Sequence, residues 1–226
     1  MKQTFENFLV SGCNAEAFQA CTALVENPGG HFLALCGSTA SGKSHLLSGV
    51  KQAFSQKYPE AKVYFRSLDE ALAEFLAAML QETPPKFEEA FCANDLLVLD
   101  NMQFLCGKSA TQEWIRKWIA HMLAAEKNVV LSFDRPLEGF RDLLNGLNPR
   151  VLQLQEPDGS LRLQYLRKVL DETGLALSED MQTAIAAAEN ISFSALRGFI
   201  LKLRLYRNQK GAPLTEAEIL RHLEEN

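Results

Sequence analysis

The chain has 226 residues, of which 47% are hydrophobic and 23% are charged. This length is enough for one α/β domain and a smaller helical one, and the composition is that of an ordinary globular protein in water. The formal net charge of -5 argues against a protein whose whole surface follows phosphate backbones, although it leaves room for a local basic patch.

The cysteines and the hydrophobic runs bear on where the protein resides. The five cysteines form no CxxC pair and lie mostly in apolar surroundings; they are Cys13, Cys21, Cys36, Cys92 and Cys106. Such thiols are typical of a reducing cytosol and argue against a metal site built on cysteine. The N-terminus has no long apolar run, and no segment reaches the length of a membrane span. We therefore expect a cytoplasmic protein without a signal peptide or a membrane association.

The first predicted elements are an aromatic segment and a helix. Residues Thr4–Val10 are rich in aromatic side chains and are expected to be extended. Asn14 is a candidate N-cap for a helix over Ala15–Glu26, which the run Asn27-Pro28-Gly29-Gly30 ends.

Residues His31–Val50 combine an apolar run, a loop of small residues and an amphipathic segment, which predicts a buried strand, a loop and a helix. The loop matches the pattern GxxxxGK(S/T), whose fixed positions are filled by Gly37, Gly42, Lys43 and Ser44. The predicted nucleotide contacts are the whole loop and the residue after it, namely Gly37, Ser38, Thr39, Ala40, Ser41, Gly42, Lys43, Ser44 and His45. The alternative is a glycine-rich turn that binds no ligand.

This loop suits a polyphosphate for three physical reasons. Glycines allow a tight turn in which successive backbone N–H groups point inward and form an anion nest. The helix that starts near Lys43 adds the positive end of its dipole. The Lys43 ammonium neutralises the outer phosphates, and the Ser44 hydroxyl is a candidate ligand of Mg²⁺. The loop therefore predicts binding of ATP or ADP together with Mg²⁺.

Strands and helices continue to alternate after the loop. The loop helix is expected to end near Pro59, and Lys62–Arg66 predicts a second strand. Apolar residues at helical spacing from Leu68 to Met79 predict a helix that Pro84-Pro85 interrupts, and a short helix is expected around Phe87–Phe91. Alternation of this kind is typical of a parallel sheet covered by helices.

The following strands are more hydrophobic. The unbroken apolar run Asp95–Asp100 is typical of a parallel strand that is buried on both faces. Ser109 and Gln112 form a capping-box pattern that is expected to open an amphipathic helix. The segments Asn128–Ser132 and Val151–Leu154 predict a fourth and a fifth strand.

From Pro157 onward the pattern indicates helices only. They are expected over Asp158–Glu172 (closed by Gly174), Ser178–Asn190, Ser192–Arg207 and Thr215–Glu225, the last with Thr215 and Glu218 as a capping box. We therefore predict a P-loop α/β nucleotide-binding domain over residues 1–156, followed by a small all-α domain over residues 157–226.

Acidic and polar residues follow two of the predicted strands. Asp100 ends a buried strand, so its carboxylate is expected at the carboxyl edge of the sheet, where it can hold Mg²⁺. The alternative is an incidental aspartate at a strand end. Ser132 and Asp134 end the next strand and are expected to face the same phosphates, unless Asp134 is only a turn residue before Arg135-Pro136.

Asn101 directly follows Asp100 and bears on catalysis. A neutral amide can orient a water molecule but cannot accept its proton, and a positioned general base contributes about 10²- to 10⁴-fold in rate. We therefore expect a site that holds ATP and hydrolyses it weakly, with Asp100, Asn101 and Asp134 as the catalytic candidates.

With these residues placed, the chain resembles the DnaA-type AAA+ ATPase family, which includes short relatives such as Hda. The resemblance rests on Phe5–Val10 with Asn14, on Leu35–Leu47, and on Asp95–Lys108 continued by Val129–Pro136. The last of these is the most specific, and the remainder of the chain matches the family only loosely.

The resemblance implies an AAA+ domain with a five-stranded parallel sheet and a helical lid. It implies that Phe8 and Val10 help to line an adenine pocket and that Asp134 is the first sensor of the bound nucleotide. It also implies partners, namely the replication initiator or further copies of the same chain.

Two arginine positions depart from the family pattern. The lid arginine of the family falls on Ser194, and Arg197, three residues further on the same helical face, is a candidate replacement. The arginine finger that reaches a neighbouring subunit is not recognisable, although Arg141 and Arg150 are nearby candidates. The favoured alternative is that each is an ordinary surface arginine, and a missing finger costs about 10³- to 10⁵-fold in turnover.

The surface that binds single-stranded DNA in the family also differs. Between the second strand and Asp95 the family has basic residues, whereas this chain has Lys86 and six acids, namely Asp69, Glu70, Glu74, Glu82, Glu88 and Glu89. The chain ends where the lid is expected to end, so we expect no helix-turn-helix domain, and nothing before Phe5 matches a clamp-binding peptide. DNA binding is therefore expected to be weak or absent.

Three functions are compatible with the residues. The first is a module that binds ATP or ADP and regulates replication initiation through another AAA+ protein. The second is an active ATPase that assembles on DNA as a minimal initiator or helicase loader. It needs a basic stripe such as Arg197, Lys202, Arg204, Arg207 and Lys210, which could instead be a solvated helix face. The third, a small-molecule phosphotransferase, lacks an evident acceptor site. The first is our working hypothesis.

Overall fold

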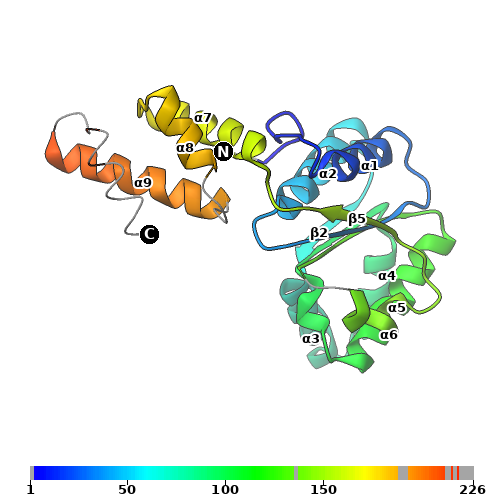
Figure 1. The fold of residues 1–226 in the computed structure, drawn as a ribbon. Coiled ribbons are helices and arrows are strands. Elements are labelled where there is room, and N and C mark those ends of the chain that lie inside the picture. Colours follow the sequence, from blue (N-terminus) through cyan, green and yellow to red (C-terminus); the bar gives the residue numbers. More distant parts are fainter. Residues whose placement is uncertain (1–2, 135–136, 188–192, 212–214, 216–217, 219–226) are drawn as a thin grey trace. The chain divides into compact units, whose positions relative to one another are not determined.

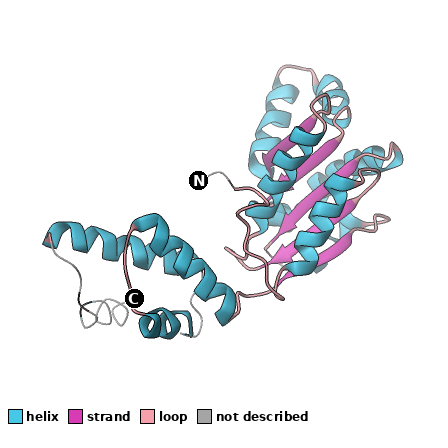
Figure 2. Cartoon of the chain, turned by 90° about the horizontal axis from the view of Figure 1, so that it is seen from above, coloured by secondary structure: helices cyan, strands magenta, loops and turns pink. Residues whose placement is uncertain are grey.

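The structure of the protein is a computed structural model, and it describes residues 3–134, 137–187, 193–211, 215 and 218. The chain divides into two compact units. Unit 1 comprises Met1–Phe8 and Asn14–Gln155, and unit 2 comprises Leu9–Cys13 and Glu156–Asn226. All described strands belong to unit 1, and the described elements of unit 2 are helices (Figure 2).

Unit 1 is built on a five-stranded parallel sheet, which confirms the predicted fold class. The strands have the order β2-β3-β4-β1-β5, and they are β1 (Phe32–Gly37), β2 (Val63–Ser67), β3 (Leu96–Asp100), β4 (Asn128–Phe133) and β5 (Arg150–Leu154). In the centre, Ala34 of β1 lies opposite Leu131 of β4 on one side and Val151 of β5 on the other. Since β3 and β4 are buried along their whole length, they consist mainly of apolar residues on both faces.

Helices cover both faces of this sheet (Figure 1). One face is covered by α1 (Ala15–Glu26) and α2 (Lys43–Lys57). The other is covered by α3 (Leu68–Leu80), α4 (Pro84–Cys92), α5 (Ser109–Ala124) and α6 (Arg141–Leu144), with the 3₁₀ turns η1 (Met102–Leu105) and η2 (Leu137–Phe140). Strand β1 serves both cores because its side chains alternate: Leu33 and Leu35 join the first, and Ala34 and Cys36 join the second.

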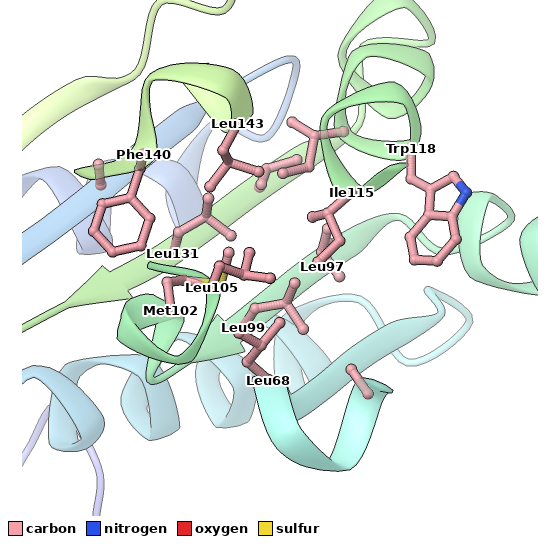
Figure 3. Close-up of a cluster of buried hydrophobic side chains, with 14 of the residues drawn as sticks. Leu68, Leu97, Leu99, Met102, Leu105, Ile115, Trp118, Leu131, Phe140 and Leu143 are labelled. Atoms are coloured by element: carbon pink, nitrogen blue, oxygen red, sulfur yellow. The ribbon is translucent and has the colours of Figure 1, made fainter. Parts of the chain in front are cut away.

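The core on the α5 face fixes where β3 and β4 end. Leu97, Leu99 and Leu131 from the strands meet Ile115 of α5 and Leu68 at the start of α3, as Figure 3 shows. Each fully buried leucine or isoleucine contributes about 1.5–3 kcal/mol by leaving water. This packing holds the carboxyl ends of the two strands side by side, and with them the polar residues that follow.

One sequence prediction about this face is wrong. Ser109 and Gln112 do not form a capping box, because Ser109 is the first helical residue and the cap position is Lys108. The Gln112 side chain is buried instead: its amide donates to the Leu105 carbonyl at 3.0 Å and its oxygen accepts from the Leu143 N–H at 3.1 Å. Gln112 thus satisfies backbone groups of two irregular segments, which the sequence pattern could not reveal.

Two smaller expectations also change. Pro84 and Pro85 do not merely interrupt a helix; they occupy the first turn of α4, where a proline lacks only an N–H that would be unpaired anyway. Asn14 stands at the cap position of α1 as predicted, but its side chain makes no capping hydrogen bond.

Unit 2 contains α7 (Gly159–Thr173), α8 (Glu179–Ala187) and α9 (Phe193–Lys210). The Asp158 side chain accepts from the Leu161 N–H at 2.7 Å and caps α7, and Gly174 ends it at φ 64. Leu166, Ile185 and Ile200 belong to the core that the three helices share. None of the helices in the described ranges has the length and hydropathy of a membrane span.

The last predicted helix, Thr215–Glu225, lies almost entirely outside the described residues. Its predicted capping box is present all the same. The Thr215 N–H donates to Glu218 Oε2 at 2.8 Å, and the Glu218 N–H donates to Thr215 Oγ1 at 3.4 Å.

Candidate functional site

The loop between β1 and α2 contains the glycines of the predicted phosphate motif. A Cβ atom on Gly37 would lie 2.5 Å from the Leu154 carbonyl oxygen, a backbone atom that has no room to move. Gly42 has φ 102 and directly precedes α2, and a Cβ there would lie 3.1 Å from Phe8 Cε2. Ala40 also has a positive φ, 65°. The glycines are therefore required by close approach at one end of the loop and by backbone conformation at the other.

Lys43 is the first residue of α2, and its side chain turns back over the loop. The Lys43 ammonium donates to the carbonyl oxygens of Gly37 at 2.8 Å and Ser38 at 2.7 Å, and the residue is only 8% exposed. Burial lowers the pKa of this ammonium, while the negative charges of Asp100 and Asp134 act in the opposite direction. A positive charge is thus held against the loop and faces two acids.

The other loop residues differ in exposure. Ser44 and Thr39 are exposed, and Ser38 is half-buried. Ser41 is buried, and its hydroxyl oxygen has no hydrogen-bond partner among the described residues. A polyphosphate held by this loop would meet backbone N–H groups, one lysine and the hydroxyls of loop serines, a donor set that suits an anion.

Two neighbouring strands bring Asp100 and Ser132 together. The Ser132 hydroxyl donates to Asp100 Oδ1, and the Asn101 N–H donates to the same oxygen at 3.0 Å. The Asn101 N–H also lies 3.0 Å from Ser132 Oγ. Ser132 is fully buried and Asp100 is 9% exposed, so the carboxylate is held in place by the ends of β3 and β4.

Asn101 has φ 63, in the left-handed region that asparagine tolerates better than most residues. Its side-chain oxygen accepts from the Gln103 amide at 3.3 Å. Asp134 follows β4, is half-buried, and is close enough to Lys43 for its negative charge to oppose the lowering of the Lys43 pKa by burial. The structure therefore brings Lys43, Asp100 and Asp134 to one edge of the sheet.

Phe8 lies against the loop from the N-terminal segment. Its ring stacks on Phe18 of α1 at 5.7 Å with an interplanar angle of 7°, and it meets the His45 ring edge-on at 5.1 Å. His45 Nε2 lies 2.9 Å from the Thr4 carbonyl oxygen and 2.7 Å from Asn7 Oδ1. His45 therefore ties the N-terminal segment to α2, a role that its place directly after the motif did not reveal.

Phe18 and Ser132 contribute to the site more than the sequence pattern suggested. Phe18 is an apolar residue of α1, and its ring stacks on the Phe8 ring. Ser132 was one of two polar candidates at a strand end, and its hydroxyl points to Asp100 rather than standing alone. Both relationships join residues that are distant in sequence, so periodicity alone could not find them.

The remaining predicted residues lie elsewhere. Val10 and Arg197 belong to unit 2, where Arg197 Nη1 lies 3.8 Å from Glu172 Oε2. The side chain of Ser194 lies outside the described part of the chain. Arg141 is an exposed residue at the start of α6, and Arg150 of β5 forms an exposed ion pair with Glu16 at 3.1 Å.

Oxygen donors are the candidate ligands for Mg²⁺. Among the residues that the structure describes, no three His, Cys, Asp or Glu side chains form a group that could hold a metal ion by themselves. Mg²⁺ in phosphate-binding loops takes one or two protein oxygens and completes its shell with phosphate and water. The Ser44 hydroxyl and the Asp100 carboxylate fit that requirement by their chemistry.

Comparison with known protein families shows to which family of phosphate-binding-loop proteins the chain belongs. The family model for the bacterial DnaA ATPase domain matches residues 1–153, about two thirds of the chain. The chain belongs to the DnaA ATPase-domain family. The resemblance inferred from the loop and from Asp95–Lys108 is thereby confirmed.

Two similar relatives are chromosomal replication initiator proteins DnaA. That of Thermodesulfovibrio yellowstonii is 30% identical over 221 residues, which cover 95% of this chain and 50% of the relative. That of Thermus thermophilus is 30% identical over 223 residues, which cover 96% of this chain and 51% of the relative. The chain thus spans about half the length of the curated relatives it matches.

Solved structures of DnaA have the same fold. Domain III of the Thermotoga maritima replication initiation protein DnaA matches with a TM-score of 0.87 and 26% identity, covering 99% of this chain and 96% of that one. A replication initiator DnaA bound to AMPPCP and single-stranded DNA matches with a TM-score of 0.80 and 25% identity, covering 93% and 68%. The α/β fold with C-terminal helices is therefore that of DnaA domain III.

Proposed function

We propose that this chain binds ATP or ADP with Mg²⁺ in the cytoplasm and regulates chromosomal replication initiation through another AAA+ protein. The observation that supports this most directly is the position of Lys43, which is buried against the loop and faces the carboxylates of Asp100 and Asp134. A DnaA relative of the same fold binds AMPPCP, a nucleotide analogue. In this proposal residues 1–156 form the nucleotide-binding domain and residues 157–226 form the lid.

Each proposed contact follows from the chemistry of its residue. The loop Gly37–Ser44 surrounds the phosphates, and Lys43 neutralises the outer ones. Ser44 and Asp100 hold Mg²⁺, which would screen phosphate charge at the bond that hydrolysis breaks. Asp134 acts as the sensor of the terminal phosphate. Phe8 and Val10 line the adenine pocket, which His45 supports through the N-terminal segment, and Arg197 serves as the arginine of the lid.

Hydrolysis is expected to be slow. Asn101 follows Asp100 with an amide that can orient water but cannot accept its proton. Arg150, one of the two finger candidates, forms an ion pair with Glu16 within the same chain. A site of this kind is suited to sensing a nucleotide rather than to rapid turnover.

The surface of α3 and α4 favours a protein partner over DNA. Six acids on this segment face solvent or pair locally, against one lysine, Lys86. Glu74, one of the six, is paired with Arg66 at 2.6 Å. A surface of this charge repels phosphates at physiological salt, so it would not follow a nucleic-acid backbone.

The proposal is tested by mixing the chain with the full-length DnaA of the same organism and separating the mixture by size. We expect the two proteins to elute together when ATP or ADP is present, and expect Lys43→Ala to abolish this. Lys51→Ala, an exposed lysine on the same helix, is the control and should behave as the wild type. Failure of the wild type to elute with DnaA in any nucleotide state would contradict the regulatory role.

A second candidate function is an ATPase that assembles on DNA. It is favoured by the basic residues of α9, of which Lys202 and Arg204 are exposed. Within the same stripe, Arg207 donates to the Gly174 carbonyl oxygen at 2.6 Å, and Lys210 is paired with Glu218. Filter binding of a single-stranded oligonucleotide at several salt concentrations separates the candidates, because only the second predicts salt-sensitive binding.

A further inference from the structure

A groove on the α5 side of unit 1 is not part of the nucleotide site. It lies between α4 and α5 and has a volume of about 780 Å³. Residues of both helices line it, among them Pro85, Glu88, Glu89, Cys92, Trp114 and Trp118. A space of this size accommodates several side chains of another protein, and its lining combines aromatic rings with acids.

The aromatic wall of the groove packs against Phe75 and is partly open to solvent. Trp114 is 43% exposed, whereas Trp118 is 8% exposed and lies at the edge of the core, as Figure 3 shows. Phe75 of α3 packs edge-on against both rings, with centroid distances of 5.4 and 5.0 Å. The indole of Trp114 is thus supported from behind and presents open surface, an arrangement that favours stacking with a cation.

The charge of the groove is negative. Glu88 and Glu89 are exposed side chains on its α4 wall. Burial raises the pKa of the Cys92 thiol, and the negative charge of Glu88 raises it further, so that carboxylate lies close to the groove. Lys117 on the opposite wall is paired with Glu113 at 3.5 Å, which leaves the two glutamates dominant.

The C-terminal half of α3 adds an exposed apolar strip. Leu76, Met79 and Leu80 are 58%, 43% and 87% exposed, and their spacing places them on one side of the helix. Met79 is one helical turn beyond Phe75, which itself touches Trp114. Apolar side chains exposed at such a concentration, on the helix whose Phe75 contacts Trp114 of the groove, are typical of a protein interaction site.

We propose that the α4–α5 groove docks a basic amphipathic segment of a partner protein, with an arginine stacked on Trp114 and paired with Glu88 and Glu89. The apolar side chains of that segment would rest on Leu76, Met79 and Leu80. Arginine fits better than lysine, because a planar guanidinium stacks on an indole and forms two parallel hydrogen bonds with a carboxylate. The acidic rim disfavours nucleic acid as the occupant, because it repels phosphates. This inference does not depend on nucleotide binding at Lys43.

Binding to the groove can be followed by tryptophan fluorescence, because the chain has two tryptophans and both line the groove. The probe is a synthetic amphipathic peptide with leucines on one face and arginines beside them, added to the full chain. We expect a saturable change in tryptophan emission and an affinity that falls as salt rises. The same peptide with lysine for arginine should bind about threefold more weakly, and the glutamate version should not bind.

Variants of the two glutamates on the rim distinguish peptide binding in the groove from binding elsewhere on the surface. Glu88→Gln/Glu89→Gln should weaken peptide binding about tenfold, and since both side chains are exposed the fold should be unaffected. Glu60→Gln/Glu138→Gln makes the same charge change outside the groove and should bind as the wild type.

Several results would overturn the inference. One is the absence of a saturable emission change with the arginine peptide. Another is equal binding of the arginine and glutamate peptides, and a third is equal binding of the arginine peptide by the two double variants. Saturation by a single-stranded oligonucleotide would assign the groove to nucleic acid instead. An emission change on concentrating the protein alone would assign it to a second copy of the chain.

Discussion

The Ser132 hydroxyl, at the end of β4, donates a hydrogen bond to Oδ1 of Asp100, at the end of the neighbouring strand β3. Both residues are buried, and the same oxygen also accepts from the Asn101 N–H. Two donors on one carboxylate oxygen restrict the rotation of the Asp100 side chain. The orientation of the Asp100 carboxylate is therefore set in part by a serine on another strand.

Replacing Ser132 with alanine should impair Mg²⁺ binding selectively. Asp100 would keep its charge but lose one of the two donors that orient it. We expect the Mg²⁺-dependent part of ATP affinity to fall about tenfold, which corresponds to about 1.4 kcal/mol. Titration calorimetry with ATP, with and without Mg²⁺, separates the Mg²⁺-dependent part of the affinity from the Mg²⁺-independent part. Thr173→Ala removes another buried hydroxyl, in α7, and is the control. An equal loss of affinity in both conditions would contradict the proposed role of Ser132.

Replacing Asn101 with aspartate should accelerate hydrolysis. The left-handed backbone of this residue, φ 63, tolerates aspartate, and a carboxylate there can accept a proton from water. We expect turnover to rise about 100-fold, measured as phosphate release from Mg²⁺–ATP. Asn101→Gly suits the same backbone without supplying a base, so it should stay as slow as the wild type. If the aspartate variant is as slow as the glycine variant, the amide is not what limits the rate.

The stability of unit 1 should depend on the ionisation of Asp95. Burial alone would raise the pKa of this carboxyl, but hydrogen bonds from the Lys127 ammonium and the Lys62 N–H lower it below its ordinary value. A depressed pKa means that the contribution is present above the unfolded value of about 3.9 and is lost as pH falls through the folded value. Asp95 thereby links the start of β3 to the residues that precede β2 and β4.

The measurement is the thermal unfolding midpoint of the wild type and Asp95→Asn between neutral pH and about pH 3. We expect the variant to be less stable at neutral pH and the difference to shrink below about pH 4. Glu60→Gln, at an exposed position outside this pair, should show no comparable pH dependence. A difference that stays constant across this range would mean that ionisation of Asp95 does not stabilise the fold.

Much of the fold could be predicted because the chain's patterns are local. The apolar run before Asp100 predicts β3 to within one residue, and the helix over Ala15–Glu26 has the predicted bounds. The strand order could not be predicted in the same way, since which strands become neighbours depends on packing between distant segments. Gln112 was misassigned for a related reason: its position fits a cap, but its partners are the distant Gly139 and Leu143.

In the candidate site, too, the residues of a local motif could be predicted, whereas contacts between distant segments could not. Gly37, Gly42 and Lys43 are fixed by a contiguous motif, and the structure places them in one loop against β1 and α2. The anchoring of Phe8 by Phe18 and His45 was not predictable, because it depends on how the N-terminal segment folds onto two helices. Trp114 shares a helical stripe with the buried Trp118, yet 43% of it remains exposed, which helical spacing alone does not indicate.

The central claim is that the loop binds a nucleotide through Lys43 and Mg²⁺, and titration calorimetry with ATP tests it most directly. The measurement compares the wild type with Lys43→Ala and with Lys51→Ala, each with Mg²⁺ and with chelator. We predict saturable Mg²⁺-dependent heat for the wild type and for Lys51→Ala. Lys43→Ala should bind about 30-fold more weakly or not at all, because truncating a buried charged partner costs about 2 kcal/mol or more. Absence of Mg²⁺-dependent heat in the wild type, or equal affinity in Lys43→Ala, would contradict the account.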